Sequence, residues 1–458
     1  MPNYLSEYFC SPDNFTRIIQ DGGVKNGSGY FRFGEEVCYG QCADIDLANM
    51  PNGSMQNALQ NAKIQGNSIS LPFDLAEIVN NLRNELYVKD SIFRSPTTAA
   101  AAKAYYLIRP ILSVSVRKYI QRIRLVDWDK VPFPHWPVDV TVDNLFAHLM
   151  LMNLDSQKVD RIPFIWFWPD GANSCAIMTH DVETTEGRDY CSKLMSINDR
   201  YGIKSSFQVV PERRYEVPES YLQEIRDRNF EINVQDLNHD GRLYRERKTF
   251  LKRIEKINEY GRQWQANGFR AAVLYRRQNW FDSLQFSYDM SVPNVSPLDP
   301  QRGGCCTVMP YFIGDILELP VTTTQDYSLF HVLNQYSLDL WKQQCELIMK
   351  KHGMMSFIMH PDYIITSREK QIYEDLLEYL AQLRDERNVW LPKPGEVNDW
   401  WRQRSKMRLV EEDGEWRIEG LGHERARVAY ASKQDGKLAI SFDSSPTAVP
   451  VVAARDRE

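Results

Sequence analysis

An apolar run that ends in two acidic residues is the sequence feature that most constrains the fold. Residues 175–178 read Cys-Ala-Ile-Met, and residues 179–183 read Thr-His-Asp-Val-Glu. The apolar letters are typical of a strand covered on both faces in a parallel α/β sheet, and residues 186–201 have a helical pattern. Ligands of such sheets and barrels bind outside the carboxyl ends of the strands, where Asp181 and Glu183 fall.

The same acidic pair has a second interpretation that needs no chemistry. Asp and Glu also favour the first turn of a helix, where they bind free N–H groups and interact with the helix dipole. Asp181 and Glu183 could therefore be capping residues of the helix that follows. The pair alone leaves both interpretations open, so the other predicted strand ends must be considered.

Four further segments place polar residues where a predicted strand ends. A short strand at 230–234 is followed by Gln235 and His239, and an apolar strand at 354–359 is followed by His360. The other two junctions are Gly268-Phe269-Arg270 and Glu318-Leu319-Pro320-Val321-Thr322. In their order along the chain, these segments resemble the motifs of the polysaccharide deacetylases, the NodB-homology or carbohydrate esterase family 4 group.

The resemblance covers roughly residues 160–400. It implies a distorted (β/α) barrel of about seven strands that removes acetyl groups from the N-acetylated sugars of a polysaccharide or its precursor. The resemblance implies that Asp181 is the catalytic base and that His360 is the general acid. An imidazole suits the role of acid because it titrates near neutral pH. Arg270 matches the arginine that orients the base. The proline expected shortly after this arginine is absent from Ala271-Ala272-Val273.

The resemblance also implies a divalent metal, zinc being the expected ion. Glu183 matches the metal-binding carboxylate, Asp181 would join it, and the next motif normally supplies two histidines four residues apart. This chain has Gln235 and His239 in those places. A neutral amide oxygen is a poor zinc ligand, so occupancy of the site is in doubt: the site is rebuilt with another residue, binds metal weakly, or binds none. His180 is the nearest substitute, but alternation along the strand points it away from Asp181.

Three residues are candidates for contacts with a substrate. Aromatic residues make up 12% of the chain, and we expect Trp280 and Tyr275 to help form a cleft in which a sugar ring stacks. Asp362 follows His360 closely and is the third candidate for a contact with the substrate. Many of the other aromatic side chains are expected to belong to the core.

Composition narrows the class of protein. With 458 residues, 43% hydrophobic content and a net charge of −6, the chain can bury a large core and is not expected to bind nucleic acid. The apolar run 162–168 is too short to span a membrane, and the first residues lack the pattern of a signal peptide. Eight cysteines without framework spacing suggest reduced thiols and a cytoplasmic protein. The oligomeric state stays open, a homo-oligomer included.

The chain divides coarsely into three parts. Residues 1–155 are predicted as an N-terminal α+β region with a linker, and residues 156–400 as the deacetylase-like barrel. Residues 401–458 are predicted as a small C-terminal β module with a flexible tail from Pro450. Its expected strands cover 407–410, 415–418, 426–430 and 437–442.

Two alternatives to the deacetylase follow from the residues themselves. Because Gln235 weakens the expected metal site, the chain could be a metal-poor pseudoenzyme that binds a glycan or a partner in polysaccharide assembly. The same mechanism would also serve an amidohydrolase that acts on an amide outside sugars. The sequence does not identify which amide is the substrate.

Overall fold

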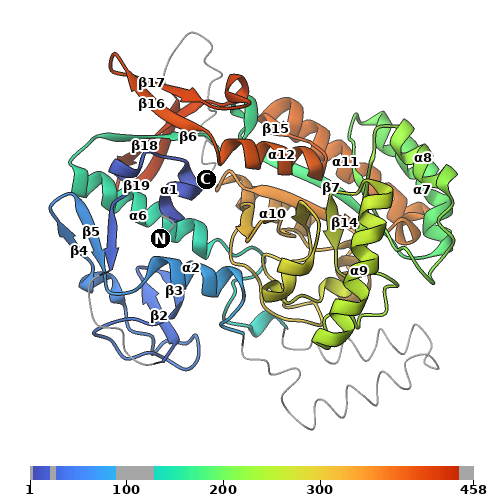
Figure 1. Cartoon of the computed structure of the whole chain (residues 1–458), viewed down its shortest axis with the longest axis horizontal. Helices are drawn as coiled ribbons and strands as arrows, with labels where there is room; N and C mark the ends of the chain where they lie inside the picture. Colours follow the sequence, from blue (N-terminus) through green and yellow to red (C-terminus); the bar gives the residue numbers. More distant parts are fainter. Residues whose placement is uncertain (1–3, 21–26, 89–127, 443–458) are drawn as a thin grey trace.

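The computed structural model describes residues 4–20, 27–88 and 128–442 (Figure 1). The predicted flexible tail at 450–458 lies outside these residues. In the view of Figure 1, the N-terminal part lies at the lower left and the barrel with its helices at the right.

A strongly curled sheet forms the centre of the molecule. Its strands follow the order β12-β13-β11-β10-β9-β8-β7-β14, and β15 pairs with the start of β7. All neighbours are parallel except β12, which runs antiparallel to β13 at the edge. The predicted distorted (β/α) barrel of about seven strands is thus confirmed. The strands are β7 (Ser174–Val182), β8 (Ser206–Val209), β9 (Glu231–Gln235), β10 (Gly268–Arg270), β11 (Tyr288–Asp289), β12 (Tyr311–Ile313), β13 (Ile316–Glu318), β14 (Met354–Met359) and β15 (Val389–Trp390).

Helices cover the outer face of this sheet. Every residue of β7 is buried, as its continuous apolar letters predict for a strand covered on both sides. Ala176 and Met178 pack in the core that the helices share, whereas Cys175 and Ile177 belong to a second core. These helices are α7 (Thr185–Arg200), α8 (Glu219–Asp227), α9 (Arg247–Trp264), α10 (Asp339–Met349) and α11 (Ser367–Arg387), whereas α12 (Pro394–Arg404) packs into the second core.

The two ends of the curled sheet meet through threonine hydroxyl groups and one backbone hydrogen bond, from the Thr323 N–H to the Ser356 carbonyl at 3.3 Å, without forming a strand ladder. The Thr322 hydroxyl donates to the Met354 carbonyl at 2.7 Å and accepts from the Ser356 N–H at 2.8 Å. The Thr323 hydroxyl donates to the Ser356 carbonyl, also at 2.7 Å. The segment after β13 therefore runs beside β14 and closes the barrel. We call this contact the seam.

The N-terminal part combines small sheets with helices. Strand β5 pairs with β1 and β4, and β2 forms a hairpin with β3. Apart from the exposed β4, these elements share one core with β6 and with the first half of β18 (Val428–Gln434). The elements are α1 (Tyr4–Phe9), β1 (Ile18–Gln20), β2 (Gly29–Phe33), β3 (Glu36–Gly40), β4 (Lys63–Gln65), β5 (Ser68–Leu71), α2 (Leu75–Arg83), α6 (Thr141–Gln157) and β6 (Arg161–Ile165).

A buried ion pair fastens the N-terminal part to the barrel. Arg276 donates to both carboxylate oxygens of Glu85, and the two side chains are 0% and 5% exposed. Gly303 leaves room for this pair, because a Cβ atom there would lie 2.5 Å from a Glu85 oxygen. Its φ of +131° also favours glycine.

The four short strands predicted near the C-terminus are confirmed. They are β16 (Arg408–Glu412), β17 (Glu415–Glu419), β18 (Val428–Gln434) and β19 (Lys437–Phe442). β16 and β17 form a hairpin, whereas β18 pairs with both β19 and β6. The C-terminal strands therefore join a sheet with the segment that precedes the barrel. The domain limits themselves stay a prediction.

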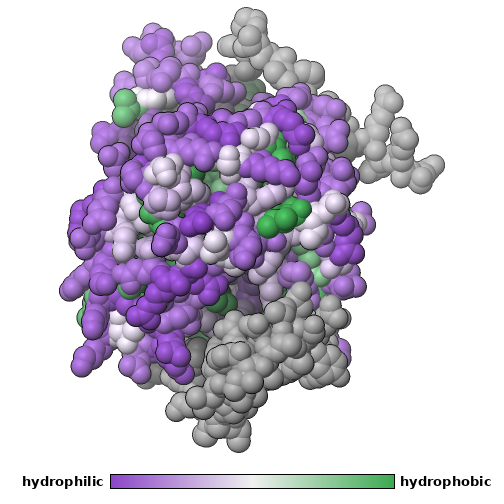
Figure 2. Space-filling model, turned by 90° about the vertical axis from the view of Figure 1, so that its right-hand side faces the viewer, coloured by the Kyte–Doolittle hydropathy of each residue, from purple (hydrophilic) through white to green (hydrophobic). Residues whose placement is uncertain are grey.

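The surface agrees with a compact chain that keeps its apolar side chains inside. The face in Figure 2 is mostly hydrophilic, with isolated hydrophobic residues in its described part. Among the helices of the described ranges, none has both the length and the apolar composition needed to cross a bilayer.

Candidate functional site

The candidate site lies where neighbouring strands end. Asp181 is the penultimate residue of β7, Gln235 and Arg270 are the last residues of β9 and β10, and His360 follows β14. Because β7 to β10 and β14 are parallel neighbours, these side chains reach the same end of the barrel. The expected convergence of strand exits is therefore present in the structure.

Asp181 is held by a buried arginine. Nη1 of Arg270 lies 3.4 Å from Oδ1 of Asp181, and both side chains are almost inaccessible to solvent. Arg270 also donates to the hydroxyl of Thr179, two residues earlier on the same strand. Burial raises the pKa of Asp181, and the charge of Arg270 opposes this shift. The arginine thus fixes the carboxylate and favours its ionised form.

Glu183 meets two imidazoles. Nε2 of His239 lies 2.8 Å from Oε1 of Glu183, and Nε2 of His360 lies 3.5 Å from the same oxygen. Burial alone would raise the pKa of Glu183, but His239 and His360 together hold this pKa well below its usual value. The pKa of His239 is raised, because Glu183 outweighs the effect of burial.

Gln235 bridges the two carboxylates. Its amide nitrogen donates to Oδ2 of Asp181 and to Oε1 of Glu183, both at 3.1 Å. Its amide oxygen is buried and has no hydrogen-bond partner. The amide therefore neutralises part of the repulsion between the two carboxylates, a role that a cation would also fill.

His360 is paired with Asp326, a residue that the sequence did not point to. Nδ1 of His360 lies 2.6 Å from Oδ1 of Asp326, and the backbone N–H of His360 donates to Oδ2 at 2.6 Å. Burial lowers the pKa of His360, but Asp326 and then Glu183 raise it well above its usual value. Asp326 fixes the ring so that Nε2 faces Glu183. No motif in the sequence around Asp326 marks it as part of the site.

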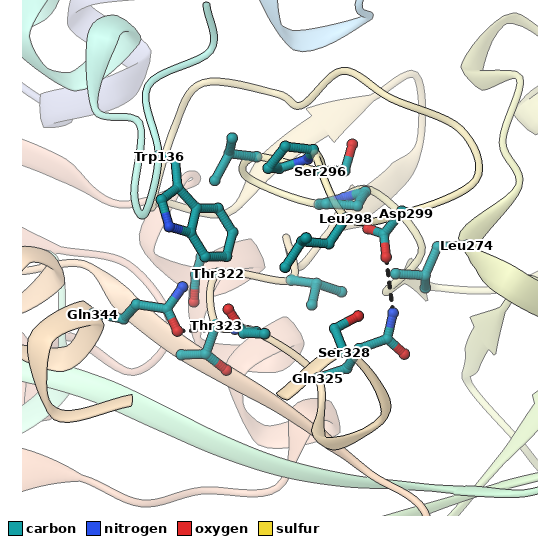
Figure 3. Close-up of a pocket in the computed structure, with 15 residues that line it drawn as sticks. Trp136, Leu274, Ser296, Leu298, Asp299, Thr322, Thr323, Gln325, Ser328 and Gln344 are labelled. Carbon is teal, nitrogen blue, oxygen red and sulfur yellow. Dashed lines mark hydrogen bonds between the residues drawn. The ribbon is translucent and has the colours of Figure 1, made fainter. Parts of the chain in front are cut away.

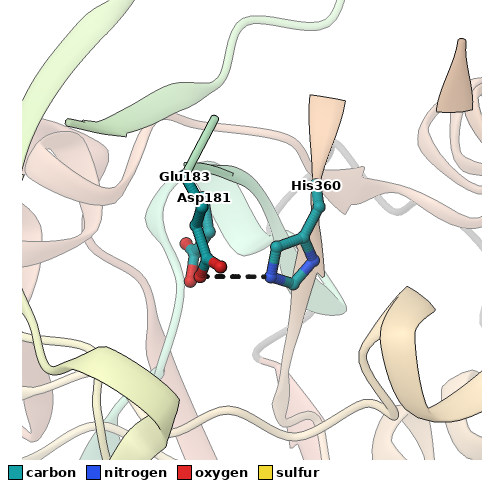
Figure 4. Close-up of side chains that lie close together, drawn as sticks. All are labelled: Asp181, Glu183 and His360. Carbon is teal, nitrogen blue, oxygen red and sulfur yellow. Dashed lines mark ion pairs between the residues drawn. The ribbon is translucent and has the colours of Figure 1, made fainter. Parts of the chain in front are cut away.

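Three of these residues could hold a metal ion. Ligand atoms of Asp181, Glu183 and His360 all lie within 4.8 Å of one another (Figure 4). Carboxylate and imidazole ligands suit zinc and similar ions, and Oδ1 of Asp181 is buried without a hydrogen-bond partner. The donor set therefore fits a divalent metal. It differs from the predicted set by including His360 in place of His239 and Gln235.

His180 takes no part in this cluster. Its ring stacks on Phe207, and its Nε2 lies 2.9 Å from the Tyr373 hydroxyl. Burial lowers the pKa of His180 to about 3. The prediction that it points away from Asp181 is confirmed.

The three predicted substrate contacts have different surroundings. Trp280, on η6 (Gln278–Ser283), packs against Phe250 with ring centroids 5.2 Å apart and is flanked by two arginines. Tyr275 lies beside Gly241. Asp362, on η8 (Pro361–Ile364), is near His360, whose charge opposes the raised pKa that burial gives this aspartate. Asp362 therefore interacts electrostatically with a residue of the candidate site.

A small pocket lies beside the seam (Figure 3). It is lined by Trp136, by the threonines after β13 and by Gln325 and Ser328, which flank Asp326. Gln325 donates to Asp299 at 2.9 Å. None of the carboxylates, imidazoles or the arginine of the candidate site lines this pocket. We therefore treat it as separate from the site.

Comparison with known proteins gives weak structural similarities. No family model and no curated protein matches the sequence. A protein assigned as a polysaccharide deacetylase from Mycobacterium smegmatis has 18% identity and a TM-score of 0.42, over 52% of this chain and 93% of its own. The Puue allantoinase has 11% identity and a TM-score of 0.41, over 51% and 92%.

A mutant of a CE4 family pseudoenzyme with restored enzymatic activity has 15% identity and a TM-score of 0.31, over 50% of this chain and 69% of its own. Similarities of this size carry no argument about activity. The structures similar to this chain nevertheless include members of the polysaccharide deacetylase family, which the order of the sequence motifs resembles.

Proposed function

We propose that the protein is a hydrolase that removes acetyl groups from N-acetylated sugars of a polysaccharide or its precursor. One observation carries the proposal: the carboxylates of the buried Asp181 and the partly buried Glu183 face His360, whose second ring nitrogen is held by Asp326. A carboxylate and an imidazole at this separation are the base and acid that hydrolysis of an amide requires.

In this mechanism Asp181 accepts a proton from the water that attacks the acetyl carbonyl carbon. Arg270 keeps the Asp181 carboxylate oriented during this step. When the C–N bond breaks, Nε2 of His360 donates a proton to the nitrogen that leaves as the sugar amine. Acetate is the second product. We propose that Asp362, near His360, binds a hydroxyl of the substrate.

A divalent metal, with zinc as the expected ion, would be held by Glu183, Asp181 and His239. His239 is the nearer of the two imidazoles to Glu183, and His360 is already engaged with Asp326. When bound, such an ion would polarise the carbonyl and lower the pKa of water. An arrangement with His360 as the ligand competes with this one, because His360 cannot be both ligand and proton donor.

A second candidate function is a glycan-binding pseudoenzyme. It is favoured by Gln235, whose amide already bridges the two carboxylates. The surrounding imidazoles and Arg270 can balance the negative charge of the site without a metal. Binding of a glycan without turnover would distinguish this function from hydrolysis.

The test is release of acetate from N-acetylated chito-oligosaccharides, with zinc, cobalt or nickel supplied. We expect Asp181→Asn and His360→Ala to lower turnover by about 10²-fold or more. The matched controls are Asp227→Asn, at the exposed end of α8, and His352→Ala, which precedes β14 at the other end of the barrel. Undiminished acetate release by Asp181→Asn and His360→Ala would show that Asp181 is not the base and that His360 is not the acid.

A non-sugar substrate is tested in the same assay with an N-acetylated amino acid. Faster release of acetate from this compound than from the oligosaccharides would show that the substrate is an amide outside sugars. A cytoplasmic location and a homo-oligomer stay predictions.

A further inference from the structure

Three aromatic rings lie together beside His360, and the proposed reaction does not use them. Tyr327 and His331 come from η7 (Tyr327–Val332), and Tyr363 comes from η8. Their ring centroids are 5.0 to 5.9 Å apart. The ring of His360 lies 4.7 Å from that of Tyr363, at a tilt of 30°. We call Tyr327, His331 and Tyr363 the ring cluster.

The ring cluster is tied to the candidate site at two points. Oδ1 of Asp326, which binds Nδ1 of His360, also accepts a hydrogen bond from the backbone N–H of Tyr327 at 2.7 Å. The N–H of Tyr363 donates to the carbonyl of His360 at 3.0 Å. The rings therefore keep a fixed position relative to the proposed acid.

The backbone that carries two of the rings is unusual. Residues 327–332 form a π-helical turn, a conformation that is rare and is frequently found at functional sites. It places Tyr327 and His331 four residues apart on the same side of the turn, so that their rings meet.

All three rings are partly exposed, whereas the neighbouring Ser328, Leu329 and Phe330 of the same turn are buried. The rings thus form an aromatic surface that is open to solvent and adjoins His360. Aromatic faces stack on the C–H groups of a pyranose ring, and the tyrosine hydroxyls and the imidazole can bind its hydroxyl groups. This chemistry fits a sugar better than an extended peptide or an anion.

We propose that the ring cluster is a binding site for a pyranose ring and sets the position of the sugar whose acetamide reaches His360. The inference rests on the proposed function for the identity of that sugar. It goes beyond it because it assigns substrate recognition to Tyr327, His331 and Tyr363, instead of to Trp280 and Tyr275.

The experiment measures binding of N-acetylated chitotriose to the full chain with zinc supplied, by ligand-observed NMR titration. We expect Tyr327→Leu to weaken binding about five- to tenfold, because stacking on an aromatic face is lost, and Tyr327→Phe to retain it. The control is Tyr201→Leu, a partly exposed tyrosine at the end of α7 that precedes β8, at the opposite end of the barrel. Unchanged melting temperatures show that each variant is folded.

Equal affinity of Tyr327→Leu and the natural protein overturns the inference, as does a natural protein that does not bind the trisaccharide. Should Tyr327→Leu be too unstable to measure, Tyr363→Leu and His331→Leu provide the same comparison. The result separates this inference from the proposed function. If binding depends on the rings but no acetate is released, the ring cluster is supported as a sugar site and the proposed hydrolase function is rejected. If acetate is released but binding does not depend on the rings, the hydrolase function is supported and the ring cluster is rejected.

Discussion

The side-chain nitrogen of Gln235 lies 3.1 Å from Oδ2 of Asp181 and donates a hydrogen bond to it. The same nitrogen reaches Glu183, so a neutral donor stands between the two carboxylates that are expected to bind a cation. For a metal to bind both carboxylates, the amide must rotate or move. The metal affinity of this site is therefore set partly by the hydrogen bonds that Gln235 would lose.

We expect Gln235→His to bind zinc at least about tenfold more tightly than the natural protein. The substitution replaces a poor ligand by an imidazole and removes the competing amide donor. The measurement is a zinc titration of both forms against a chelator of known affinity. Gln235→Leu is the control, because it removes the amide without adding a ligand. A natural protein that retains one equivalent of metal through chelator dialysis, with Gln235→His no tighter, would contradict the prediction.

The two imidazoles at Glu183 are expected to differ in their roles. His239→Ala should weaken zinc binding by at least about tenfold, the usual result of losing one ligand or its support. His360→Ala should change zinc affinity by less than about threefold while lowering acetate release by about 10²-fold or more, because His360 is assigned to proton donation. Parallel zinc titrations of the two variants show which of the two histidines is a zinc ligand. The opposite order of affinities would assign the metal to Asp181, Glu183 and His360.

Asp299, at the edge of the pocket in Figure 3, gives a prediction for stability against pH. Burial raises its pKa from 3.8 to about 6, against the opposing charge of Arg276. Between these values the folded protein binds more protons than the unfolded chain, so this residue lowers stability as the pH rises from about 4 to about 6. Asp299→Asn lacks this effect but can still accept the hydrogen bond from Gln325.

We therefore expect the melting temperature of Asp299→Asn to exceed that of the natural protein by an amount that grows over this range and is then constant. The difference in unfolding free energy has an upper bound of about 3 kcal/mol. Thermal unfolding at pH 4, 5, 6 and 7 is the measurement. A constant difference across all four values would show that Asp299 does not have the raised pKa.

The ion pair between Glu85 and Arg276 should be essential for stability. Arg276→Met leaves the Glu85 carboxylate buried without its partner, which costs about 3–5 kcal/mol. The double variant Glu85→Gln with Arg276→Met should recover a large part of this loss. Urea unfolding of the three proteins measures both effects. The control is Arg425→Met, because its pair with Asp170 is about half exposed and should contribute less than about 1 kcal/mol.

The sequence predicts the strands that build the site because they are short, apolar and end in polar residues. β7 and β14 are buried along their whole length, so their letters are continuous rather than alternating. The position of Gln235 at the end of β9 follows from the same pattern. The C-terminal strands are also predicted, but the pairing of β18 with β6 is not, because periodicity identifies strands and says nothing about distant partners.

The partner of His360 could not be found in this way. Asp326 lies 34 residues earlier, after a run of threonines, and nothing in its neighbours marks it as part of the site. The ring cluster has the same difficulty, since His331 has no partner pattern in the sequence. Both depend on the path of the segment after β13, which tertiary contacts determine.

The segment after β13 links closure of the barrel to the geometry of the candidate site. Asp326 belongs to the segment on one side of the seam, and His360 belongs to the end of β14 on the other. The hydroxyl contacts of Thr322 and Thr323 align the two sides below this pair. Any fluctuation that parts them also separates the imidazole from its carboxylate and displaces Tyr327 from Tyr363. Amide hydrogen exchange at Ser356 and His360 would thus detect one opening event. That event is both a local unfolding of the barrel and the separation of His360 from Asp326.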